Sequence, residues 1–155
     1  MKYSFQYIKP GSEVIAPPCD YDQEKEPTEA TVTDEAFASV VIQTEPTLRV
    51  DMTLWHDEEA IVEFTIADGA AWTLGDALRC VLTVFDRALE CRERGYSGTG
   101  LVSDPIVVGG RTISVSGDAL EPTSGEELWL WEDPMTVLHA ISRRADGVWA
   151  LHFDT

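Results

Sequence analysis

The sequence predicts an α+β domain in which hairpins form a mainly antiparallel sheet and one long amphipathic helix packs on one face of it. Three observations predict this fold. Apolar and polar residues alternate with a period of two on both sides of several short polar breaks. One long segment, about 73–94, instead repeats its apolar residues every three or four positions. The pair Gly109-Gly110 and the pair Asp146-Gly147 separate neighbouring apolar runs, as in tight hairpin turns.

The first third of the chain predicts one strand and one ambiguous element. Residues 3–9 alternate aromatic and polar side chains, which is typical of a short strand, and Pro10-Gly11 ends it. Segment 33–43 fits two structures. Its acidic start, Thr33-Asp34-Glu35, suits a helix N-terminus, whereas Ser-Val-Val-Ile at 39–42 suits a strand. We predict a short helix over 33–43, with a strand as the alternative.

The clearest hairpin is predicted between residues 48 and 66. Apolar side chains recur at every second residue over 48–54 and again over 62–66, and a polar break at 56–59 separates the two runs. Because alternate side chains of a strand point to opposite faces, this pattern indicates two paired strands with one buried face.

The long helix follows this hairpin. Thr73 is a suitable N-cap, Asp76 stands three positions later, and Gly95 lies just past the predicted end. At 100° per residue, Cys80, Val84 and Cys91 fall on the side opposite the main apolar stripe. Incidental small apolar residues, or cover from a loop region, account for that side; the alternative is a second contact surface, for a homodimer.

Strands are predicted again in the last third of the chain. Gly109-Gly110 between 106–108 and 111–116 indicates a hairpin, and residues 128–131 read as a further strand. Asp146-Gly147 between 137–144 and 148–153 predicts a final hairpin. A helix starting at Asp133-Pro134 is the alternative for the first arm of that hairpin.

The length and charge of the chain bound its class. A chain of 155 residues fits a single domain, here 1–155, with an acidic loop at about 17–30 that we expect to be mobile. With 28 acidic and 11 basic residues the net charge is −17. Such a chain repels nucleic acid and anionic lipid, so the expected partner is a basic protein.

The cysteines and the apolar runs predict a cytoplasmic protein. Cys19, Cys80 and Cys91 are odd in number and lack the spacing of a zinc site or a disulfide framework. No signal peptide is visible behind Met1, and no run approaches the roughly 18 apolar residues of a membrane span. We expect no cofactor and no metal.

No catalytic motif stands out. The sequence lacks the glycine-rich dinucleotide and phosphate loops, the nucleophile elbow and the metalloprotease helix motif. His139 and His152 would be cross-strand neighbours in the final hairpin, with Asp154 close by; this trio resembles a metal site, and the two histidines with a carboxylate are the basis of an enzymatic alternative. The simpler interpretation places both histidines as half-buried strand residues.

The leading hypothesis is an acidic, protein-binding inhibitor, most specifically an immunity or antitoxin protein that neutralises a basic toxin or nuclease. The alternatives are a small acidic dimeric chaperone or adaptor and an enzyme of unfamiliar type. Trp129 and Trp131 share one strand face and are either core residues or an aromatic anchor with an acidic rim. The predicted partner-binding residues are these two tryptophans together with Asp57, Glu58, Glu59, Asp20, Asp22, Glu24 and Glu26.

Overall fold

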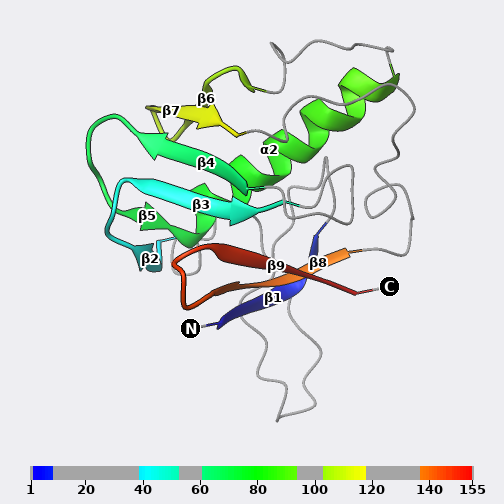
Figure 1. Cartoon of the computed structure of the whole chain (residues 1–155), viewed down its shortest axis with the longest axis horizontal. Helices are drawn as coiled ribbons and strands as arrows, with labels where there is room; N and C mark the ends of the chain where they lie inside the picture. Colours follow the sequence, from blue (N-terminus) through cyan, green and yellow to red (C-terminus); the bar gives the residue numbers. More distant parts are fainter. Residues whose placement is uncertain (1, 9–38, 53–60, 94–102, 118–136, 155) are drawn as a thin grey trace.

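The computed structural model describes residues 2–8, 39–52, 61–93, 103–117 and 137–154. Within these residues strands predominate beside one long helix, α2, which spans Leu74–Glu93 (Figure 1). Seven strands form a mixed sheet in the order β1-β8-β9-β3-β4-β7-β6, and β2 pairs with β5 in a small second sheet. The strands are β1 Lys2–Ile8, β2 Val41–Gln43, β3 Thr47–Asp51, β4 Ile61–Ile66, β5 Trp72–Thr73, β6 Ile106–Val108, β7 Arg111–Ser116, β8 Val137–Arg143 and β9 Trp149–Asp154.

The three predicted hairpins are confirmed as strand pairs. β3 and β4 are antiparallel with Val50 opposite Val62, and buried apolar residues alternate along both strands with more exposed residues, as the sequence pattern requires. Gly109 and Gly110 join β6 to β7 with φ values of 59° and 77°, which side chains other than glycine rarely adopt. β8 pairs antiparallel with β9, so the helix considered from residue 134 is wrong over 137–143.

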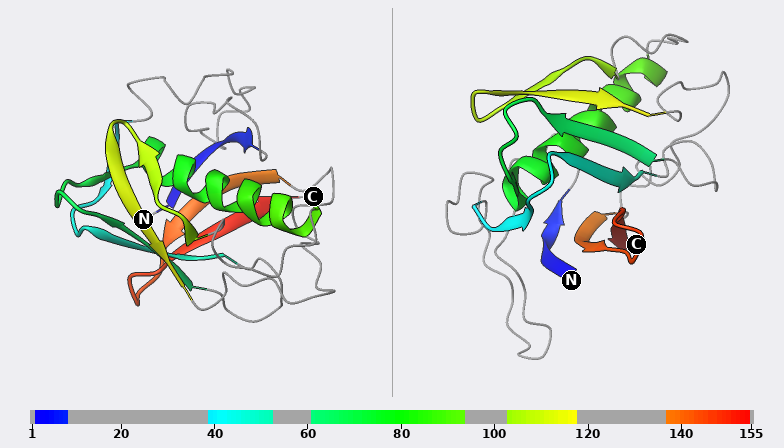
Figure 2. Two further views of the ribbon diagram at one scale, coloured as in Figure 1. Left: turned by 90° about the horizontal axis from the view of Figure 1, so that it is seen from above. Right: turned by 60° about the vertical axis from the view of Figure 1, so that its left-hand side comes forward.

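The sheet is mixed because β3 and β9 run parallel. Val50 lies beside Trp149 and Asp51 beside Ala150. This pairing joins the strands β1, β8 and β9 to the strands β3, β4, β7 and β6. The right-hand view of Figure 2 shows the resulting twist, from β6 and β7 at the top to β1, β8 and β9 at the bottom.

The short helix predicted over 33–43 is wrong at its end, where residues 41–43 form β2. Val41 lies opposite Thr73 and Gln43 opposite Trp72 of β5. Ile42 is buried in the core, so the β-branched run at this point behaves as a strand rather than as the end of a helix. Residues 33–38 lie outside the described residues, as do the strand predicted over 128–131 and the acidic loop predicted at 17–30.

Helix α2 begins at the predicted cap. The Asp76 backbone N–H donates to Thr73 Oγ1 at 3.3 Å, which satisfies one of the amide groups left open at a helix N-terminus. The burial of α2, however, does not follow the single stripe that the sequence predicted. Cys80 and Val84, which lie opposite the predicted stripe, are fully buried in the same core as Leu78 and Phe85.

The burial of Cys80 and Val84 agrees with the interpretation that another part of the chain covers this side, and not with an exposed contact surface. The physical reason is that α2 has more than one neighbour. Its side chains share the main core with those of β3 and β4, and the helix also contacts β5 and β6. A helix packed on several sides buries residues around most of its circumference.

In the described part of the chain, no helix is both long enough and apolar enough to cross a membrane.

Candidate functional site

The strand register places most connections of the sheet at one end. β4 is antiparallel to both β3 and β7, so β3 and β7 finish where β4 begins. β9 runs parallel to β3 and antiparallel to β8, so β9 finishes and β8 begins at that end as well. We call this the connection end; it lies on the right in Figure 1. The opposite, turn end carries the tight turns at 109–110 and 144–147.

The acidic residues are distributed unevenly between the described residues and the connections. The described residues hold 11 acidic and 8 basic residues, a net charge of −3. The remaining 17 acidic and 3 basic residues give the rest of the chain a net charge of −14. Segments 53–60 and 118–136 together hold nine acidic residues and neither lysine nor arginine, and both are flanked on each side by strands at the connection end. The described residues are thus close to neutral, and most of the net negative charge belongs to the other segments.

The stems of these two acidic segments are in direct contact. Gly117 follows β7, and a Cβ built on it would lie 2.6 Å from the carbonyl oxygen of Ile61, the first residue of β4. That distance is below any ordinary contact, so only glycine allows the two backbones to approach so closely. The close approach anchors the beginning of segment 118–136 beside the end of segment 53–60.

The predicted partner-binding residues all lie outside the described residues, so their placement stays a prediction. The structure does bring the flanks of two of the three groups together at the connection end. The third group lies within 9–38, which leaves the sheet at the same end, after β1, and returns before β2. The residues concerned are Asp57, Glu58 and Glu59 in the first group, Trp129 and Trp131 in the second, and Asp20, Asp22, Glu24 and Glu26 in the third.

At the turn end, described charges neutralise one another. Arg144 pairs with Asp146 at 2.6 Å and with Asp51 at 3.2 Å, and Arg143 pairs with Glu45 at 3.3 Å. The hydrogen bond from the Arg144 guanidinium, followed by the Val148 N–H, lowers the pKa of Asp146 to about 2. These pairs hold the β8–β9 turn against β3 and leave little net charge there.

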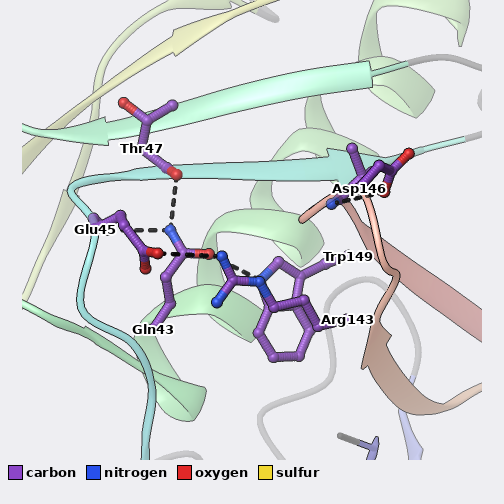
Figure 3. A network of polar contacts seen from close by, with 7 residues as sticks. Gln43, Glu45, Thr47, Arg143, Asp146 and Trp149 are labelled. Atoms are coloured by element: carbon purple, nitrogen blue, oxygen red, sulfur yellow. Dashed lines mark hydrogen bonds and ion pairs between the residues drawn. The ribbon is translucent and has the colours of Figure 1, made fainter.

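A buried amide organises the same end of the molecule (Figure 3). Gln43 Nε2 donates to the backbone oxygens of Glu45 at 3.0 Å and Thr47 at 2.7 Å, and Gln43 Oε1 accepts from Trp149 Nε1 at 2.9 Å. One side chain thus ties β2, the start of β3 and the start of β9 together. Sequence reasoning missed this contact because Gln43 lay in the predicted helix, 106 residues before its partner.

The two histidines singled out in the sequence come together on β8 and β9. The ring centroids of His139 and His152 are 6.4 Å apart, and the Oγ of Ser142 lies 2.6 Å from His152 Nε2. Burial, followed by the charges of Lys2 and His139, lowers the pKa of His152. The Asp154 side chain lies outside the description, and within the described residues no group of three His, Cys, Asp or Glu side chains is arranged to hold a metal. Ser142 carried no signal in the sequence.

Cys80 does not form the dimer surface predicted for it. Its side chain is fully buried and its thiol is free, and burial raises the pKa of that thiol above its ordinary value. Val84 is buried to the same extent, and the Cys91 side chain lies outside the described residues. Two of the three residues considered for a dimer contact surface are therefore buried within the single chain. The oligomeric state stays a prediction.

Comparison with known proteins gives no relative to set beside this site. No protein-family model matches the chain, and no curated protein and no solved structure shows a significant match to it.

Proposed function

We propose that this chain is an acidic, protein-binding inhibitor that acts in the cytoplasm, most specifically an immunity or antitoxin protein that neutralises a basic toxin or nuclease. The observation that carries the proposal is the separation of charge from framework. The described residues have a net charge of −3, whereas the segments between them have a net charge of −14.

This separation matters because a dense group of acidic residues is suited to a cationic partner. Glu45, Asp51 and Asp146 are paired with arginines of the same chain. The segments 53–60 and 118–136 contain nine acidic residues and neither lysine nor arginine. A concentrated field of one sign attracts a cationic surface and raises the rate of association. The active site of a nuclease, which binds phosphate, is such a surface.

Aromatic anchors would supply the apolar part of the interface. Trp129 and Trp131 stand between Glu126-Glu127 and Glu132-Asp133 in the sequence. Buried tryptophans with a charged surround are typical of the residues that dominate binding energy in protein interfaces. In this proposal Asp57, Glu58 and Glu59 attract the partner and speed association. The two tryptophans pack against the partner and slow dissociation.

The test begins with the neighbouring gene. If that gene encodes a secreted protein with a basic C-terminal domain, this domain is the probe, and co-expression with the chain is expected to restore the growth of cells that the domain kills. Reversal of Asp57, Glu58 and Glu59 to lysine is expected to cut the association rate at low salt by about an order of magnitude or more. Rescue by the triple variant at the wild-type rate, with association indifferent to salt, would argue against electrostatic recognition.

A matched control separates local from global charge. Reversal of Glu63, Asp68 and Asp86 changes the net charge by the same amount but on the folded framework. The control is expected to slow association much less, because the field of a charge is screened beyond about 8–10 Å at physiological ionic strength. Equal slowing in both variants would mean that only the total charge matters.

A further inference from the structure

The pairing of β8 and β9 is irregular at His139, and the irregularity has a chemical consequence. Leu138 lies opposite Phe153 and Ala140 opposite His152, and the register shifts between these two pairs. In a regular strand, His139 and Ala140 would point to opposite faces, which would carry His139 away from His152. A bulge re-aims the side chain at its position, and the His139 ring lies 6.4 Å from the His152 ring.

Two imidazoles on neighbouring strands, in their neutral forms, are suited to a borderline metal ion. Zinc binds imidazole nitrogen at about 2.0–2.1 Å, so two rings on one tetrahedral ion have centroids about 5 Å apart. The observed rings need to close by about 1 Å, which small side-chain rotations within their wells provide. Imidazole nitrogen favours zinc, nickel and copper, whereas magnesium and calcium prefer oxygen ligands.

Ser142 Oγ fixes one nitrogen of the His152 ring in a hydrogen bond. With Nε2–H donating to the Ser142 Oγ, the lone pair of Nδ1 is left for a metal. A hydrogen bond of this kind, on the nitrogen that does not bind, is usual for metal-binding histidines and raises the basicity of the ligand. Burial of the ring also favours its neutral form, which is the form that binds metal.

We propose that His139 and His152 together bind one divalent transition-metal ion, such as Zn²⁺ or Ni²⁺, with Ser142 as a positioning residue. Among the described residues, no third His, Cys, Asp or Glu side chain is arranged to join these two. The proposal does not depend on the function proposed above, since it rests on β8 and β9 rather than on the acidic segments.

The test uses the whole chain, stripped of metal with a chelator and titrated with Zn²⁺ in a calorimeter. The variants His139→Ala and His152→Ala are each expected to weaken Zn²⁺ binding at least tenfold. The Ser142→Ala variant is expected to weaken it about 10- to 100-fold, as loss of such a partner does elsewhere, and Ser142→Thr to restore it. The matched control is His56→Ala, which removes the third histidine of the chain and is expected to leave binding unchanged.

Two further measurements make the result decisive. Mg²⁺ at the same concentration is expected to give no binding at this site, which distinguishes ligation from general attraction of cations to a chain of net charge −17. In the unaltered protein, Zn²⁺ is expected to shift the NMR signals of two of the three histidine rings, so the test stands even if a variant does not fold. Wild-type Zn²⁺ affinity in the His139 and His152 variants, or no shift of their ring signals, would overturn the proposal.

Discussion

The hydrogen bonds of Gln43 predict a strong energetic coupling between two residues that are far apart in sequence. Gln43 is 4% exposed and Trp149 is 1% exposed, so neither the amide nor the indole can exchange its partner for bulk water. Replacing Gln43 with methionine keeps the approximate volume but leaves the Trp149 N–H without its acceptor. One buried donor left in this way costs about 1–3 kcal/mol, and the loss of the contact to the Thr47 carbonyl adds to it, so we expect about 2–4 kcal/mol in all.

A double-mutant cycle isolates the part of this cost that belongs to the pair. Trp149→Phe removes the indole donor and leaves Gln43 Oε1 unsatisfied, so it is also destabilising. In the double variant both orphaned groups are gone, and the combined loss is expected to fall short of the sum by about 1–2 kcal/mol. The free energies of unfolding come from urea titrations followed by far-UV circular dichroism, since tryptophan fluorescence changes with the substitution itself. A coupling below about 0.5 kcal/mol would refute the reasoning.

Three more predictions follow from described contacts. Leu78→Ala is expected to cost about 2–5 kcal/mol in urea unfolding, because Leu78 is fully buried; a loss below about 0.5 kcal/mol would mean that α2 is not part of the core. Gly117→Ala places a methyl group against the Ile61 carbonyl and is expected to cost about 1–3 kcal/mol, whereas the exposed control Ser116→Ala should change the free energy by less than about 0.5 kcal/mol. The lowered pKa of Asp146, about 2, means that its stabilising contribution is present above about pH 4 and is lost as the pH falls towards 2. Thermal melts should therefore show Asp146→Asn less stable than the wild type at pH 7 and the difference shrinking towards pH 2.

The parts of the fold that could be predicted from the sequence are those governed by neighbouring residues. Gly109 and Gly110 adopt the positive φ angles that their hairpin requires, and Gly147 does so in the β8–β9 turn. Thr73 caps α2 because a short polar side chain stands directly before the first apolar turn of the helix. Period-two alternation identified the buried face of β3 and β4 because each strand has one side towards the core.

The parts that could not be predicted depend on contacts between distant segments. The sequence of β3 contains no sign that β9 lies beside it, since parallel neighbours leave no turn signal between them. The burial of Val84 does not follow from the single apolar stripe in the sequence, because α2 has neighbours on several sides. The contact between Ser142 and His152 depends on a register that no local pattern specifies. The predicted binding residues lie outside the described residues, so they are inferred from sequence and charge alone.

The parallel pairing of β3 with β9 has a consequence for the synthesis of the chain. Val50 is made about a hundred residues before Trp149, its neighbour in the sheet. At about 5–20 residues per second, the edge of β3 that receives β9 stays without that strand for about 5–20 seconds on the ribosome. An unpaired strand edge is a template for pairing with another chain. During this interval β3 and β4 of the nascent protein are complete, but the edge of β3 has no β9 to pair with. A message that stops before Trp149 would leave that edge unpaired permanently.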